Sequence, residues 1–260
     1  TIAQREKPKV LVCGASAYPR LIDFQAFATI AHEVGAVAIA DIAHVAGLVV
    51  GGAHPSPLPE TDIVTTTTHK TLRGPRSAII LAKAQYGAAI DKAIIPGLQG
   101  GPMEHIIAAK AVAFKEAMEP SFQAYARQIV ANAQALAAAL MEAGLTLVSN
   151  GTDNHLMLID LTTLNLAGKQ AETLLDEVEI TVNKNMIPYD PRKPLDPSGI
   201  RLGTPALTTR GFTEDDMRIV GRTIAEVLKN PTSDDVKTRA RATVRELTEK
   251  HPLYPNLAIL

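Results

Sequence analysis

Asp41 and Lys70 each follow a short apolar run that predicts a buried strand, at residues 36–40 and 63–68. Ligands of α/β sheets bind beyond the carboxyl ends of the strands, where these two side chains would stand. A lysine amine can condense with the aldehyde of a cofactor, and a carboxylate can hold a pyridinium nitrogen protonated. Alone, Asp41 could cap a turn and Lys70 could extend to solvent, but together they favour a pyridoxal phosphate site.

The strands that would carry these side chains are predicted from the hydrophobic pattern. Apolar and β-branched runs predict buried strands at residues 10–14, 36–40, 63–68 and 77–82. Helical spacing of apolar residues predicts a helix at 23–34, which would end at Gly35. Strands separated by a helical segment or by long loops are typical of an α/β fold with a partly parallel sheet.

The pattern changes after the glycine- and proline-rich residues 96–102. Long alanine-rich stretches predict helices at 103–117 and 121–143, and shorter units follow them. These units are predicted strands and helices at 145–148, 156–161, 169–179, 214–229 and 234–250. We therefore expect two regions, residues 1–110 and residues 111–260, joined by helix.

The composition limits the classes of protein to which the chain can belong. Its 260 residues carry 26 Lys and Arg against 27 Asp and Glu, which argues against a dedicated nucleic-acid or membrane-surface protein. Cys13 is the only cysteine, so it can form no internal disulfide and no zinc–thiolate cluster. No run approaches the roughly 18 apolar residues of a membrane helix. We expect a cytoplasmic protein without a metal site.

The segments around Asp41 and Lys70 resemble those of a known family. Asp41 to Leu48, followed by Val64 to Arg76 with its run Thr-Thr-Thr-Thr-His-Lys, is similar to the pyridoxal phosphate signature of the serine hydroxymethyltransferases. The likeness continues in the same order along the chain, at residues 96–102, 151–156, 181–185 and 199–206. It spans essentially the whole chain, an extent that chance does not produce.

The resemblance implies the α/β fold of the fold-type I pyridoxal phosphate transferases, which are similar to aspartate aminotransferase. Residues 1–110 would be part of the large cofactor-binding domain, and residues 111–260 a linking helix with the smaller C-terminal α/β domain. The family transfers the hydroxymethyl group of L-serine to tetrahydrofolate, which gives glycine and 5,10-methylenetetrahydrofolate. Its members carry further chain ahead of the position of Thr1, so we expect the isolated chain to be inactive and the complete enzyme to be a homo-oligomer.

The resemblance also assigns the residues around the pyridoxal ring. Lys70 matches the lysine to which the cofactor is covalently bound, and Asp41 matches the partner of the pyridine nitrogen. Ser16 and His44 match residues near the phenolic oxygen of the ring. These assignments agree with the chemistry expected of an amine and a carboxylate at neighbouring strand ends.

Further residues match positions around the substrate and the phosphate. Thr67 and His69 match residues that help to fix the bound cofactor and the reaction specificity. Arg201 matches the guanidinium that binds the substrate carboxylate, a natural bidentate pair. Gly100 and Gly101 match a loop that contacts the cofactor phosphate across a subunit interface, a task that suits backbone amides without side chains.

The folate co-substrate would lie near a separate group of residues. Asn185 and the loop formed by Lys193, Pro194 and Leu195 match positions near bound folate, and this loop differs most from the family pattern. The expected partners are therefore L-serine, glycine, tetrahydrofolate and further copies of the chain, and neither nucleic acid nor a membrane.

Other functions remain open from the sequence. A threonine aldolase-type enzyme needs the same Lys70 and Asp41 but no folate, although the segment 183–185 and the threonine run favour the transferase. A catalytically silent fragment that acts as an interaction module is a further alternative. A metallohydrolase built on Asp41, His44 and His69 comes last, because no fourth ligand has suitable spacing.

Overall fold

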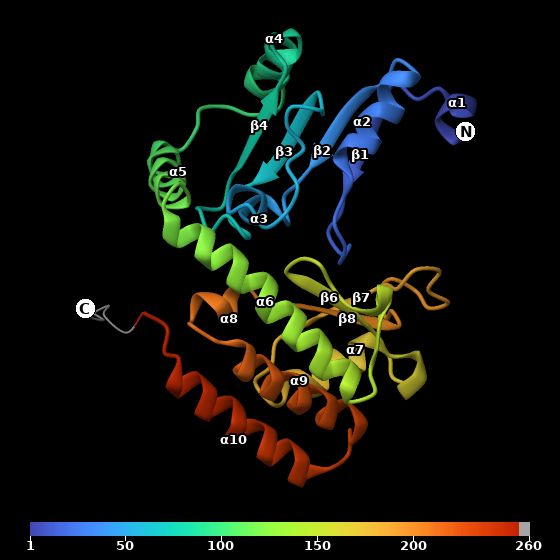
Figure 1. The fold of residues 1–260 in the computed structure, drawn as a ribbon, viewed down its shortest axis with the longest axis vertical. Coiled ribbons are helices and arrows are strands. Elements are labelled where there is room, and N and C mark those ends of the chain that lie inside the picture. Colours follow the sequence, from blue (N-terminus) through green and yellow to red (C-terminus); the bar gives the residue numbers. More distant parts are fainter. Residues whose placement is uncertain (255–260) are drawn as a thin grey trace. The chain divides into compact units, whose positions relative to one another are not determined.

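The computed structural model describes residues 1–254, which divide into two compact units. The first unit, coloured blue to green in Figure 1, contains Thr1–Ser16 and Leu21–Arg127. The second contains Ala17–Arg20 and the residues from Gln128 onward. Helix α6 (Pro120–Glu142) includes the boundary between the two units. The division of the chain into domains at residue 110 stays a prediction.

The first unit is built on a four-stranded sheet in which β1, β2, β3 and β4 lie side by side in that order (Figure 1). The strands are β1 (Val10–Gly14), β2 (Val37–Asp41), β3 (Ile63–Thr67) and β4 (Ala78–Ala82). The first three are parallel, with Cys13 opposite Ala40 and Ala40 opposite Val64, and β4 runs antiparallel to β3. The four predicted strands and the partly parallel sheet are therefore confirmed.

Helix α2 (Phe24–Glu33) packs against this sheet through buried side chains that include Phe24. It begins where Asp23 caps it, because the carboxylate accepts a hydrogen bond of 2.9 Å from the backbone N–H of Ala26. Gly35, at φ +73°, follows its end, as the sequence predicted. The other helical segments of this unit are α1 (Ile2–Glu6), α3 (Ala46–Val50), α4 (Ala84–Lys92), η1 (Ala93–Leu98) and α5 (Glu104–Ala117).

The second unit contains an antiparallel sheet in the order β5–β6–β8–β7. Its strands are β5 (Thr146–Leu147), β6 (Leu156–Asp160), β7 (Asn183–Asn185) and β8 (Gly199–Gly203). Arg201 of β8 stands opposite Leu158 on one side and Asn183 on the other. Its other segments are η2 (Val148–Asn150), η3 (Thr162–Leu164), α7 (Gly168–Asp176), α8 (Pro205–Thr209), α9 (Glu214–Lys229) and α10 (Asp234–Lys250).

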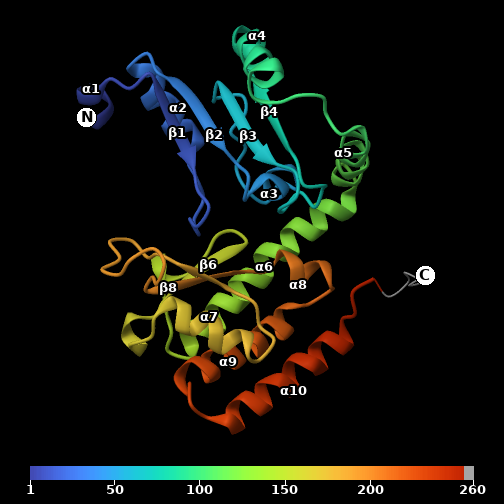
Figure 2. The same ribbon diagram turned by 180° about the vertical axis from the view of Figure 1, so that it is seen from behind.

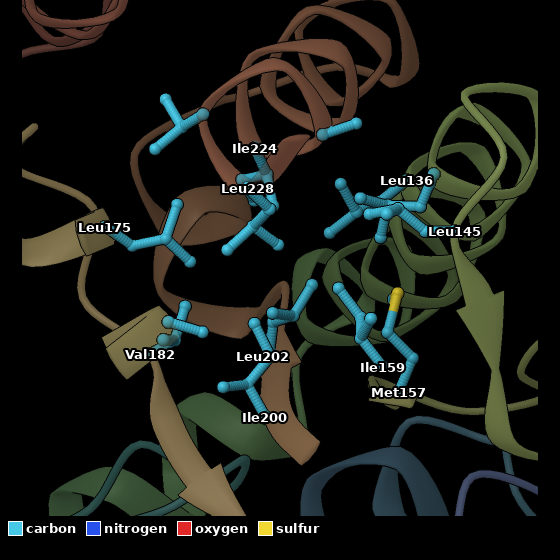
Figure 3. Packing of buried hydrophobic residues seen from close by; sticks show 14 of the residues in the cluster. Leu136, Leu145, Met157, Ile159, Leu175, Val182, Ile200, Leu202, Ile224 and Leu228 are labelled. Atoms are coloured by element: carbon cyan, nitrogen blue, oxygen red, sulfur yellow. The ribbon is translucent and has the colours of Figure 1, made fainter. Parts of the chain in front are cut away.

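The core of the second unit lies between its sheet and its helices. Figure 3 shows Leu136 of α6, Leu175 of α7, Ile200 of β8 and Leu228 of α9 converging, and each is at most 2% exposed. Truncation of one such side chain to alanine costs about 2–5 kcal/mol. Helix α10 packs on the side of α9 that faces away from the sheet (Figure 2). No helix within residues 1–254 is long and apolar enough to span a membrane.

Candidate active site

The carboxyl ends of the parallel strands bring predicted site residues to one edge of the sheet in the first unit. Asp41 is the last residue of β2 and stands opposite Thr65 of β3, while Thr67 is the last residue of β3. Lys70 follows shortly after β3, and Ser16 follows shortly after β1. This edge therefore carries an amine, a carboxylate and hydroxyl groups.

Gly14 allows the backbone to approach closely at this edge. A Cβ at this position would lie 2.2 Å from the carbonyl oxygen of Asp41, and its φ of +133° is open only to glycine in practice. The Asp41 side chain is oriented by the turn that follows β2, because its Oδ1 accepts a hydrogen bond of 2.9 Å from the backbone N–H of Ala43. The end of β2 thus presents a carboxylate that local backbone holds in place.

The segment after β2 and the segment after β3 are packed tightly against each other. A Cβ at Gly47 would lie 2.1 Å from the carbonyl oxygen of Thr71, so only glycine fits there. The hydroxyl of Thr67 donates a hydrogen bond of 3.4 Å to the carbonyl oxygen of Ala43. His44 lies half-buried in the first of these segments, which places it at the same edge as Lys70.

The side chain of His69 contacts that of Arg76. From the sequence alone, Arg76 could be a residue that only flanks the site. The Nη1 of Arg76 lies 3.2 Å from Nε2 of His69. Because a guanidinium can only donate, Nε2 is the acceptor, and the ring proton is on Nδ1. This Nδ1 is buried and has no hydrogen-bond partner among residues 1–254. An unsatisfied buried donor beside Lys70 marks a place where a ligand acceptor would be stabilised.

The turn after Lys70 is fixed by its own contacts. Arg73 adopts φ +59°, and its guanidinium carbon lies 4.2 Å from the ring centre of Tyr125. The hydroxyl of Thr68 donates a hydrogen bond of 2.6 Å to the carbonyl oxygen of Pro75, and Thr68 is fully buried. Lys70 therefore extends from a backbone that is anchored on both sides.

The donor set at this edge fits pyridoxal phosphate. The half-buried Lys70 takes part in none of the ion pairs within residues 1–254, so its amine can react with an aldehyde. The exposed carboxylate of Asp41 can pair with a pyridine nitrogen, and Nδ1–H of His69 offers a donor. Within the same residues, no group of three or more His, Cys, Asp or Glu could hold a metal ion.

Arg201, predicted to bind the substrate carboxylate, lies on the central strand β8 of the second unit. Its Nη2 donates a hydrogen bond of 3.3 Å to Oδ1 of Asn183, and partial burial lowers the pKa of the guanidinium. The next residue of β7, Lys184, is held by Glu172, which accepts hydrogen bonds from its backbone N–H and its Nζ at 3.1 and 2.8 Å. Sequence reasoning missed Asn183 as a partner because β7 is too short to show a periodicity.

The remaining predicted residues lie in connecting segments. Asn185 ends β7, and its side-chain amide donates a hydrogen bond of 2.7 Å to the carbonyl oxygen of Met186. The exposed loop between β7 and β8 carries Lys193, Pro194 and Leu195. In the first unit, Gly100 and Gly101 are exposed, and a Cβ at either would meet nothing within 4 Å. Contacts within the described chain therefore do not require glycine there, and the phosphate-loop role stays a prediction.

Comparison with known proteins identifies the family of the chain. The family model described as serine hydroxymethyltransferase matches residues 1–224. The serine hydroxymethyltransferase of Myxococcus xanthus is 58% identical over 254 residues, 98% of this chain and 61% of the relative. Those of Nostoc and Microcystis aeruginosa are 56% and 54% identical over 259 residues, 99% of this chain and 61% of each relative. The chain thus spans about three fifths of the length of these curated relatives, and it belongs to the serine hydroxymethyltransferase family.

Proposed function

We propose that the protein containing this chain is a pyridoxal phosphate-dependent serine hydroxymethyltransferase. L-Serine and tetrahydrofolate would give glycine, 5,10-methylenetetrahydrofolate and water. Enzymes of this family use pyridoxal phosphate as cofactor and tetrahydrofolate as co-substrate. The observation that carries the proposal is the juxtaposition of Asp41 at the end of β2 with Lys70, which follows the adjacent parallel strand β3.

The assignment of the fold is part of the same proposal. A parallel sheet closed by an antiparallel strand, with the reactive groups at its carboxyl edge, supports a fold-type I enzyme similar to aspartate aminotransferase. Residues 1–110 would belong to the large domain, and residues 111–260 would form the linking helix and the small domain. A homo-oligomer and a cytoplasmic location complete the proposal, as does inactivity of the 260-residue chain when it is alone.

The residues of the first unit would bind the cofactor and control its protons. Bound pyridoxal phosphate supplies an aldehyde for covalent attachment and a ring that accepts electron density from the substrate. The Lys70 amine would hold the cofactor through that aldehyde, and as a free amine it could take up or return a proton. Asp41 would keep the ring nitrogen protonated, and the Nδ1–H of His69 would donate to an acceptor beside the ring. Ser16 and His44 would lie near the phenolic oxygen.

The remaining residues would orient the two substrates. Arg201 would bind the carboxylate of serine bidentately, with its guanidinium plane held by Asn183, so that the breaking bond is aligned for reaction. Thr67 would help to fix the reaction specificity. Gly100 and Gly101 would contact the phosphate of the cofactor across a subunit interface. Asn185 and the loop of Lys193, Pro194 and Leu195 would contact folate.

A folate-omission assay tests the reaction class. The chain would be combined with the segment of the Myxococcus xanthus relative that it does not match, supplied as a separate polypeptide. Glycine formation from L-serine is expected only when tetrahydrofolate is present. Equal rates with and without tetrahydrofolate would contradict the transferase and support an aldolase-type enzyme. The chain without the added segment is the control, and it is expected to give no turnover.

A further inference from the structure

The carboxylate of Asp190 organises the loop that connects β7 to β8. Its Oδ1 accepts hydrogen bonds from the backbone N–H of Arg192 at 2.9 Å and from the hydroxyl of Ser198 at 2.6 Å. Its Oδ2 accepts from the backbone N–H groups of Ile187 at 3.2 Å and of Ser198 at 2.9 Å. One side chain thus joins the start, the middle and the end of the loop.

The base of the loop is anchored in the second unit. Ser198 is 1% exposed, and its carbonyl oxygen accepts a hydrogen bond of 2.9 Å from the backbone N–H of Leu161. The carbonyl oxygen of Pro197 accepts one of 2.6 Å from the N–H of Gly168, which opens helix α7. Through Ser198, Asp190 connects the loop to these fixed elements.

The tip of the loop is closed but exposed. The guanidinium of Arg192 donates hydrogen bonds to Oδ2 of Asp196 at 2.7 Å and to its carbonyl oxygen at 3.1 Å. The backbone N–H of Asp196 donates one of 2.9 Å to the carbonyl oxygen of Lys193. Leu195 is nevertheless 84% exposed. The loop therefore has a defined shape and an apolar side chain that the described residues of the second unit leave exposed.

Asp190 is suited to this task only as an anion. Burial raises its pKa, but the hydrogen bonds from Ser198, Arg192 and Ile187 outweigh that effect and lower the pKa to about 2. At neutral pH the carboxylate accepts all of its bonds and donates none. An amide at this position would set an N–H₂ group against at least one of the backbone N–H donors, which leaves that donor unsatisfied.

We propose that Asp190 is a positioning residue for the folate co-substrate, a role that rests on the proposed function. It would hold the loop so that Lys193, Pro194 and Leu195 stand in their binding arrangement before folate arrives. A loop that is already ordered loses less conformational entropy on binding. Loss of Asp190 would therefore weaken folate binding without a matching effect on serine.

The kinetic test compares Asp190→Asn with Asp160→Asn. Each variant chain is combined with the unmatched segment of the Myxococcus xanthus relative, and we call this combination the complemented assembly. Asp160 is a matched control, because its Oδ1 also accepts from a backbone N–H and a hydroxyl, both of Thr162. Asp190→Asn is expected to raise the KM for tetrahydrofolate about tenfold and to leave the KM for L-serine within about twofold. Asp160→Asn is expected to change neither. Equal folate KM values in the two variants and the wild type would overturn the role of Asp190.

Ser198→Ala is a second variant that tests the same role if Asp190→Asn does not fold. It removes one donor to the carboxylate and leaves the other three, so a smaller rise in folate KM is expected, about threefold. An unchanged folate KM in this variant would then overturn the role. If the wild-type assembly shows no folate-dependent turnover at all, the proposed function itself fails, and the role of Asp190 fails with it.

Limited digestion with trypsin tests the loop in the 260-residue chain alone. Cleavage between Arg192 and Lys193 is expected to be faster in Asp190→Asn than in the wild type and in Asp160→Asn, because a loosened loop enters the protease more readily. Equal cleavage rates in all three proteins would show that Asp190 does not fix the loop, which would overturn the inference whatever the kinetics.

Discussion

The hydroxyl of Thr71 donates a hydrogen bond of 3.0 Å to the carbonyl oxygen of His44. The same hydroxyl accepts one of 3.0 Å from the backbone N–H of Gly47. Thr71, which is 2% exposed, thus joins the segment that follows Asp41 to the segment that carries Lys70. Together with the pairing of β2 with β3, this buried side chain fixes the relative position of the two segments.

Replacement of Thr71 by valine is expected to destabilise the chain by about 1–3 kcal/mol, because it leaves two buried backbone groups unsatisfied without changing the size of the side chain. Thr71→Ser keeps the hydroxyl and is the matched control, with a smaller loss. Urea unfolding of the three proteins measures the difference. Equal midpoints for the valine and serine variants would show that the two hydrogen bonds contribute nothing.

Lys70→Gln in the complemented assembly is expected to abolish folate-dependent turnover, because glutamine cannot attach to an aldehyde. Lys110→Gln replaces another half-buried lysine of the same unit and serves as the control, with near-normal turnover. Turnover is measured as glycine formed from L-serine. Near-normal activity of Lys70→Gln would exclude Lys70 as the cofactor lysine.

Arg201→Ala is expected to raise the KM for L-serine by more than about 30-fold, since loss of one partner of a desolvated charge pair costs about 2–5 kcal/mol. Arg201→Lys keeps the charge but loses the bidentate geometry, so an intermediate value is expected. Steady-state kinetics against serine concentration measure both. A serine dependence unchanged in the alanine variant would remove Arg201 from the substrate site.

The lowered pKa of Asp62 predicts that the folded chain loses stability in acid. Burial raises its pKa, but hydrogen bonds from Lys83, Ala38 and His32 outweigh this and lower the pKa to about 2. Because the folded pKa lies below the unfolded value, the stabilisation is present above about pH 4 and disappears as the pH falls toward 2. It amounts to about 2 kcal/mol.

Unfolding free energies of the wild type and Asp62→Asn between pH 5 and pH 2 test this. The advantage of the wild type is expected to shrink over that interval, because protonation of Asp62 removes the charge that the variant already lacks. A constant difference between the two proteins across the interval would contradict a depressed pKa at Asp62.

Local patterns were sufficient to predict the elements that frame the site. The β-branched runs ended by Gly14 and Asp41, and the cap at Asp23, are local signals, so strands β1 to β3 and helix α2 appear within one or two residues of their predicted bounds. The same holds for α9 and α10, whose acidic first turns and basic last turns agree with the helix dipole.

The contacts that orient the side chains could not be predicted from the sequence. The pairing of Arg76 with His69, the strand β7 that holds Asn183, and the four hydrogen bonds of Asp190 all depend on turns whose geometry the pattern does not encode. Asp190 lies in a proline-rich loop, where sequence alone indicates only an irregular connection. A buried Nδ1 on His69 is visible only once the fold is known.

Reduction with borohydride in the presence of pyridoxal phosphate, followed by peptide mass mapping, tests directly whether Lys70 binds the cofactor. The assembly of the chain with the unmatched segment of the Myxococcus xanthus relative would be used. We expect a pyridoxyl adduct that is concentrated on the peptide containing Lys70 and absent from Lys110, and we expect Lys70→Gln to lose it. An adduct concentrated on another lysine, or spread evenly over exposed lysines, would exclude Lys70 as the cofactor lysine.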